Sequence, residues 1–171
     1  GALGLDGNLI LEALQTIGYK PRGQFHLFPA PGPLLKAPGS AFSFSYTAFE
    51  AHPPMTARGK DAEVLTKLFE ERATKAGLPY TLVETQAANS FAAWQLLEAS
   101  VNATKSLDDK KLAAWLRANA VATVVGRMDF GGQNNYGRDH GKIKQIQGGR
   151  WVVVWPREFA APGANVVYPA P

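Results

Sequence analysis

The side chains that could act in catalysis or hold a metal ion are few and scattered along this sequence. Its three histidines are His26, His52 and His140, and none has a second histidine at the spacing of a zinc-binding helix. Cysteine is absent, which excludes a thiolate nucleophile, a thiolate zinc site and a disulfide. We therefore expect no metal site and no catalytic residues, and so no enzyme.

Other motifs of enzymes and cofactor sites are missing as well. No Gly-x-Ser-x-Gly sequence is present, and the pairs Glu70–Glu71 and Asp108–Asp109 stand beside lysines on expected helices. The glycine-rich stretches at 1–7 and 131–137 lack the spacing of a phosphate-binding loop. We interpret the acidic pairs as solvated helix surface, and we expect no cofactor.

Composition indicates a folded protein without a nucleic-acid interface. The chain has 171 residues, of which 46% are hydrophobic and 19% charged. Its net charge of +4 is dispersed rather than gathered with stacking aromatics, so we expect no nucleic-acid partner. No apolar stretch approaches the ~20 residues that span a bilayer. The first residues do not resemble a signal peptide, and we expect the sequence to begin within a longer protein.

Helical spacing of apolar residues predicts four helices. They are expected from about Asp6 to Ile17, over 60–76, over 85–104 and from Ser106 onwards, with Asp6 and Ser106 as N-caps. Each should bury one apolar stripe. The stripes are Leu9, Ile10, Ala13, Leu14 and Ile17; Leu65, Leu68, Phe69 and Ala73; Phe91, Trp94, Leu97 and Val101; and Leu112, Trp115 and Leu116.

Short strands are predicted between and after the helices, at 24–28, 41–49, 123–125, 142–147 and 150–155, with 29–33 as a loop. Aromatic residues alternate with Ser and Thr over 41–49, which predicts a strand with a buried aromatic face. Gly148–Gly149 predicts a two-residue hairpin turn. The pattern is α/β, but the first half holds too few strands for a typical sheet of about five, so strands from elsewhere are required.

Two parts of the sequence resemble a known family. The first comprises Leu112–Ala120, Thr123–Gly126, Met128–Phe130, Lys142–Gln147 and Arg150–Pro156, and it resembles the C-terminal signature of one group of transport proteins. These are the periplasmic substrate-binding proteins of branched-chain amino-acid ABC transporters. The second part, Asp6–Lys20, resembles a helix and turn just past the middle of those proteins.

The resemblance implies an α/β, two-lobed type 1 periplasmic binding protein fold, of which this chain supplies the C-terminal half. Residues 1–40 would belong to the second lobe and residues 41–125 to the first lobe. Residues 126–171 would form the hinge crossing and a β-hairpin that returns to the second lobe. The N-terminal half of the same protein is then an implied partner.

The resemblance also implies a function. The chain would belong to a periplasmic solute-binding component of an ABC importer, which delivers its ligand to a membrane permease. The ligand would be an amino acid or a small carboxylate, aromatic carboxylates included, held in the cleft between the lobes. The alternative is a ligand-sensing domain of the same fold within a receptor or regulator.

Four residues are expected at that ligand: Leu5, Asp6, Phe49 and His52. The family often places an acidic residue before this helix, where it meets the ammonium group of the ligand, and Asp6 matches that position. The alternative for Asp6 is an N-cap alone. Phe49 and His52 stand where a strand ends and a Pro-Pro loop begins, a position that commonly lines a cleft, although an aromatic residue there can also fill the core.

Overall fold

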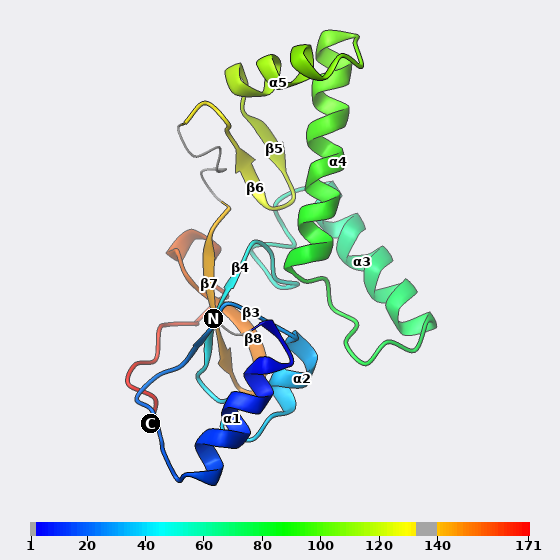
Figure 1. Ribbon diagram of the computed structural model, residues 1–171. Helices are drawn as coiled ribbons and strands as arrows, with labels where there is room; N and C mark the ends of the chain where they lie inside the picture. The colour runs from blue at the N-terminus through cyan, green and yellow to red at the C-terminus, as the bar shows by residue number, and fades with distance from the viewer. Residues whose placement is uncertain (1–2, 133–139) are drawn as a thin grey trace.

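The computed structural model describes residues 3–132 and 140–171, so most of the predicted turn at 131–137 lies outside the described residues. Its elements form two groups (Figure 1). The helices α1 (Asp6–Thr16) and α2 (Pro31–Lys36) lie beside a four-stranded sheet, and we call this group the sheet region. The helices α3 (Lys60–Lys75), α4 (Thr85–Thr104) and α5 (Asp109–Ala118) form the other group, which we call the helical region.

The sheet mixes parallel and antiparallel pairs. Its strand order is β2-β4-β7-β8, in which β2 pairs parallel to β4 and the other pairs are antiparallel. A parallel pair, β1-β3, and an antiparallel pair, β5-β6, complete the strands of the described residues. The strands are β1 (Leu3–Gly4), β2 (Phe25–His26), β3 (Phe28–Pro29), β4 (Phe44–Thr47), β5 (Val121–Thr123), β6 (Gly126–Met128), β7 (Lys142–Gln147) and β8 (Arg150–Trp155), followed by a 3₁₀ turn, Arg157–Phe159.

The hairpin β7-β8 confirms the sequence pattern to the residue. Both of its turn glycines adopt positive φ, 57° at Gly148 and 73° at Gly149. Two consecutive left-handed residues give the turn a twist that matches the flanking strands, and glycine reaches that conformation without strain.

Several predicted strands and loops were wrong in their bounds. The strand expected at 24–28 is divided into β2 and β3. The one expected at 123–125 comprises the last residue of β5 and the two-residue turn that leads to β6. The loop expected at 29–33 leads directly into α2, whose first residue is Pro31. Proline is favoured at that position, because its φ suits a helix and its missing N–H has no partner in the first turn.

The prediction for the faces of β4 was also wrong. The side chains of Ser43, Ser45 and Thr47 are buried, whereas Phe44 and Tyr46 remain partly exposed. Hydrogen bonds satisfy the hydroxyls of Ser45 and Thr47, whereas the Ser43 hydroxyl has no partner in the described residues. The Ser45 hydroxyl donates to the Leu27 carbonyl at 3.3 Å, and the Thr47 hydroxyl donates to the Phe49 carbonyl at 2.7 Å.

The helices confirm their expected positions better than their expected faces. In α1, Leu11 is buried while Leu9, Ile10 and Ile17 of the predicted stripe are exposed. In α4, small residues face inward, and the side chains of Trp94 and Leu97 are exposed. In α3, Leu65 and Ala73 of the stripe are buried and Leu68 is exposed. The stripe of α5 is only partly buried, because no residue of that helix is buried.

Two predicted N-caps were wrong. Leu5 occupies the cap position of α1, Asp6 is the first helical residue, and no side-chain cap is formed. The cap of α5 is Asp108, whose carboxylate accepts from the Lys111 N–H at 3.0 Å, while Ser106 bonds to the Asp108 N–H. The carboxylate of Asp108, rather than the hydroxyl of Ser106, therefore caps the first turn of α5.

The described residues bury three apolar clusters rather than one. The largest joins α3 and α4 to the loop after β4 and to Val153 of β8. A second packs Leu11 of α1 and Leu34 of α2 against Ile146 and Trp151 of the hairpin. A third covers the opposite face of β8 with residues that follow the 3₁₀ turn. The sheet region and the helical region therefore have separate cores that meet along β8.

Candidate functional site

An aromatic surface lies at the junction between the sheet region and the helical region. Phe28 at the start of β3 packs edge-on against Tyr46 of β4, with ring centroids 5.5 Å apart. Tyr46 in turn packs against His140, just before β7, at 5.9 Å. We call these three residues the aromatic wall. Strands β4 and β7 run side by side here, so residues distant in the sequence meet at this point (Figure 1).

The polar atoms of the wall form a chain of hydrogen bonds. The Tyr46 hydroxyl lies 2.5 Å from Nδ1 of His140, and Nε2 of His140 lies 3.0 Å from Oδ1 of Asn89 on α4. Burial, reinforced by the nearby Lys142 ammonium, holds the pKa of His140 below its ordinary value. Burial also raises the pKa of Tyr46. Both side chains are therefore neutral near pH 7, and this series of hydrogen bonds links α4 to β4.

A buried polar cluster supports the wall from behind. The Thr47 hydroxyl lies 2.8 Å from the Thr85 hydroxyl at the start of α4 and 3.2 Å from Oε1 of Glu50. Glu50 forms an ion pair with Lys144 of β7, and both side chains are almost fully buried. This cluster fixes β4, β7 and the start of α4 against one another, which holds the wall in place.

Leu5 and Asp6 follow the strand that pairs with β3, which contains Phe28 of the wall. In the parallel pair β1-β3, Leu3 lies opposite Phe28, and the Ala30 N–H donates to the Gly4 carbonyl at 2.8 Å. Leu5 and Asp6 follow β1 directly, so they lie at the carboxyl end of this pair, and both are exposed. Ligands of open α/β folds bind outside the carboxyl ends of parallel strands.

Phe49 and His52 lie elsewhere. Phe49 has 0% exposed surface and packs in the largest core cluster, which supports the core-filling alternative. His52 accepts from the Val153 N–H at 3.0 Å through Nε2, while Nδ1 bonds to the Pro53 carbonyl at 2.7 Å. Leu5 and Asp6 thus lie just after the strand pair β1-β3, whereas Phe49 and His52 pack on the side of β8.

Sequence reasoning missed the wall itself. The sequence pattern places Phe28 in a strand, Tyr46 on a buried face and His140 in a polar turn, and nothing in it joins the three. One feature of the sequence could have predicted it. The resemblance implies that the segments of β4 and β7 both cross between the two lobes, so the residues at the ends of these strands should lie close together. Asn89 gave no signal, because its position on α4 follows from helix packing alone.

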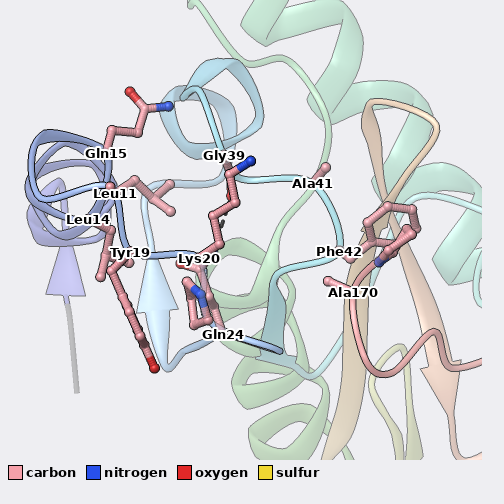
Figure 2. A pocket seen from close by; sticks show the side chains of 13 residues that line it. Leu11, Leu14, Gln15, Tyr19, Lys20, Gln24, Gly39, Ala41, Phe42 and Ala170 are labelled. Atoms are coloured by element: carbon pink, nitrogen blue, oxygen red, sulfur yellow. Dashed lines mark hydrogen bonds between the residues drawn. The ribbon is translucent and has the colours of Figure 1, made fainter.

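A separate pocket of about 430 Å³ lies along the C-terminal part of α1. Figure 2 shows its lining, which combines apolar side chains such as Leu11, Leu14 and Phe42 with the polar ends of Lys20 and Gln24. The pocket contains none of the four predicted site residues. It lies within the sheet region and away from the start of α1, so it fits less well than the wall with a ligand that binds between two lobes.

A metal-binding cluster and a membrane-spanning helix are both missing from the described residues. Among residues 3–132 and 140–171, no three His, Asp or Glu side chains come close enough to hold a metal ion. In the same part of the chain, no helix is both long and apolar enough to cross a membrane.

Comparisons with known proteins give the fold. No protein-family model matches the sequence, and no curated protein matches it. Solved structures do match the described fold. A putative branched-chain amino acid ABC transporter protein from Silicibacter pomeroyi has a TM-score of 0.67 and 15% identity, covering 96% of this chain and 44% of its own. A leucine-binding protein from Thermotoga maritima has a TM-score of 0.64 and 15% identity, covering 86% and 40%.

A third structure is a solute-binding protein of an ABC transporter from Rhodopseudomonas palustris in complex with benzoate. It has a TM-score of 0.57 and 14% identity, covering 95% of this chain and 50% of its own. The chain thus spans about half the length of these structures or less. The expected α/β fold of the substrate-binding proteins, of which the chain supplies part, is confirmed.

Proposed function

We propose that this chain is the C-terminal half of a periplasmic solute-binding protein that delivers its ligand to an ABC permease. The ligand would be an amino acid or a small carboxylate, bound between two lobes. The aromatic wall carries this proposal, because it lies at the junction of the two regions, beside Leu5 and Asp6 at the carboxyl end of β1-β3.

The chemistry of this surface suits a small organic ligand. Phe28 is 36% exposed and Leu5 is 59% exposed, so both offer apolar area to a ligand. The exposed Asp6 carboxylate would accept a charge-assisted hydrogen bond from an ammonium or hydroxyl group. Leucine-binding and benzoate-binding proteins share this fold, so both kinds of ligand are reasonable first probes.

The N-terminal half of the same protein would complete the site. Apolar side chains that the sequence pattern assigns to the core lie exposed on two helices: Leu9, Ile10 and Ile17 on α1, and Trp94 and Leu97 on α4. Contiguous exposed apolar faces often mark an interface. The half-length match to the solved structures supports the same reading.

A ligand-sensing domain of a receptor or regulator remains the second candidate function. The same half-length match and the same aromatic wall would serve it equally well. The two functions differ in the protein that recognises the closed, ligand-bound form: a permease in the first case and a signalling segment in the second.

Calorimetry on the full-length protein tests the binding function. We expect L-leucine or benzoate to bind, and we expect Asp6→Asn to weaken a ligand with an ammonium group about tenfold or more. Glu12→Gln is the matched control, since Glu12 is exposed further along the same helix. Equal losses in both variants, or no binding by any small carboxylate or amino acid, would contradict the proposal.

A further inference from the structure

The hydrogen-bond chain behind the aromatic wall has a defined direction. An amide oxygen can only accept a hydrogen bond, so the contact of 3.0 Å between Nε2 of His140 and Oδ1 of Asn89 requires a proton on Nε2. In a neutral imidazole the other nitrogen then has no proton and can only accept. The Tyr46 hydroxyl, 2.5 Å from Nδ1, must therefore donate its own hydrogen to His140.

This direction decides what the Tyr46 oxygen can offer elsewhere. Once its hydrogen is used, the oxygen retains only lone pairs, and within the described part of the chain it forms no other hydrogen bond. Tyr46 is half-buried and its ring packs edge-on against Phe28, so the two rings belong to the same surface of the junction. The Asp6 carboxylate near this surface is also an acceptor.

We propose that Tyr46 is a specificity-determining residue that selects ligands bearing an ammonium or hydroxyl donor, and that Asn89 sets this preference as a positioning residue acting through His140. This inference rests on the proposed function. A ligand donor would complete the bonding of the Tyr46 oxygen. A ligand carboxylate placed there would meet an acceptor without a hydrogen, which is unfavourable in a partly desolvated site.

Neighbouring charges are compatible with this direction. Among the described residues, Lys142 is a cation near His140, and it opposes protonation of the imidazole. Lys144 is paired with Glu50, and the Glu84 carboxylate accepts from the Gln86 and Ala87 N–H groups at the start of α4. None of these side chains competes with Asn89 for Nε2 of His140 in the described residues.

The first experiment determines, without a ligand, which groups donate in the hydrogen bonds that join Tyr46, His140 and Asn89. Nitrogen-15 NMR of the imidazoles in the full-length protein should find His140 as the Nε2–H tautomer at pH 7.5, with His140→Gln to assign its signals. Asn89→Leu should remove that preference, whereas Asn102→Leu should retain it, because Asn102 lies exposed on the same helix. A wild-type Nδ1–H tautomer would overturn the inference.

The second experiment reads specificity by calorimetry with matched pairs of probes. The pairs are L-leucine with 4-methylpentanoate and 4-hydroxybenzoate with benzoate, which differ by one donor. In the pair that binds, we expect Tyr46→Phe to weaken binding of the donor-bearing probe about tenfold. Binding of its partner should weaken less than about threefold. Asn89→Leu should reduce the same preference.

The outcomes separate the two proposals. If a pair binds but Tyr46→Phe changes both probes equally, or the probe without the donor binds more tightly, the specificity inference fails and the proposed function stands. If neither these probes nor any other amino acid or small carboxylate binds, the proposed function fails and the inference fails with it.

Discussion

The ammonium group of Lys144 forms an ion pair with the carboxylate of Glu50, and the two side chains are only 5% and 3% exposed. Lys144 belongs to β7, and Glu50 belongs to the loop that leaves β4, so the pair joins the two segments that cross between the sheet region and the helical region. The Lys144 ammonium also lies 4.7 Å from the ring centre of Trp151. A buried charge with this many partners depends on all of them.

Removal of one member of this pair should be costly. We expect Glu50→Ala to lower the free energy of unfolding by about 3–5 kcal/mol, because it leaves the Lys144 ammonium buried without its counter-charge. The double variant Glu50→Gln with Lys144→Met should recover most of that loss, since it removes both charges. Urea unfolding of the full-length protein measures both, with Glu71→Ala at an exposed site of α3 as the control. A double variant as unstable as Glu50→Ala would contradict this account.

Two histidines should make the fold less stable in acid. Burial lowers the pKa of His26 and, together with Lys142, that of His140, and Nε2 of His26 has no hydrogen-bond partner in the described residues. The unfolded chain titrates near its ordinary value of about 6.5 and so binds more protons than the folded chain just below it. Stability should therefore fall as the pH drops below about 6.5, and level off below the folded pKa values.

Urea midpoints at pH 7.5 and 5.5 test this dependence. In the double variant His26→Gln with His140→Gln, the difference between the two midpoints should shrink clearly. The comparison of midpoint differences, rather than of midpoints, corrects for any loss of stability that the substitutions cause at both pH values. A wild-type protein equally stable at both pH values would refute the prediction.

The hairpin turn should tolerate only residues that reach positive φ. Nothing lies within 4 Å of the position that a β-carbon would take at Gly149, so the cost of Gly149→Ala is conformational and should be about 1–2 kcal/mol. Gly149→Asn should cost less, because asparagine visits the left-handed region more readily. Gly132→Ala is the control, since that position is also open but has no positive φ. Thermal unfolding ranks the three variants, and equal effects at both sites would show that the turn does not require φ > 0.

The sequence predicted elements where local signals were strong. Helix α4 has the expected bounds of Thr85 and Thr104, and β7 and β8 have theirs, because apolar periodicity and a two-glycine turn are local properties of the chain. Element faces were less predictable. The aromatic side of β4 lies partly exposed because Ser45 and Thr47 find hydrogen-bond partners inside, and those partners come from distant segments.

The candidate site was predictable only in part. The resemblance to the family predicted Asp6, with the neighbouring Leu5, as site residues, and both follow a strand of the parallel pair β1-β3. Their contact with a ligand stays a prediction. The wall could not, because the contact of Tyr46 with His140 joins residues 94 positions apart. Only the pairing of β4 with β7 brings them together, and that pairing depends on the register of the whole sheet.

The exposed tryptophan of α4 gives the sharpest test of the proposed N-terminal half. Trp94 is 70% exposed in this chain, and Leu97, about one turn further along the same helix, is exposed too. If the N-terminal half covers that face, Trp94→Ala should lower the free energy of unfolding of the full-length protein by about 3 kcal/mol, as for a buried aromatic residue. Leu107→Ala is the control, because Leu107 is 83% exposed in the connection between α4 and α5 and should cost less than about 1 kcal/mol. Urea unfolding compares the two variants. Equal, small losses would mean that Trp94 stays in solvent and that another surface joins the two halves.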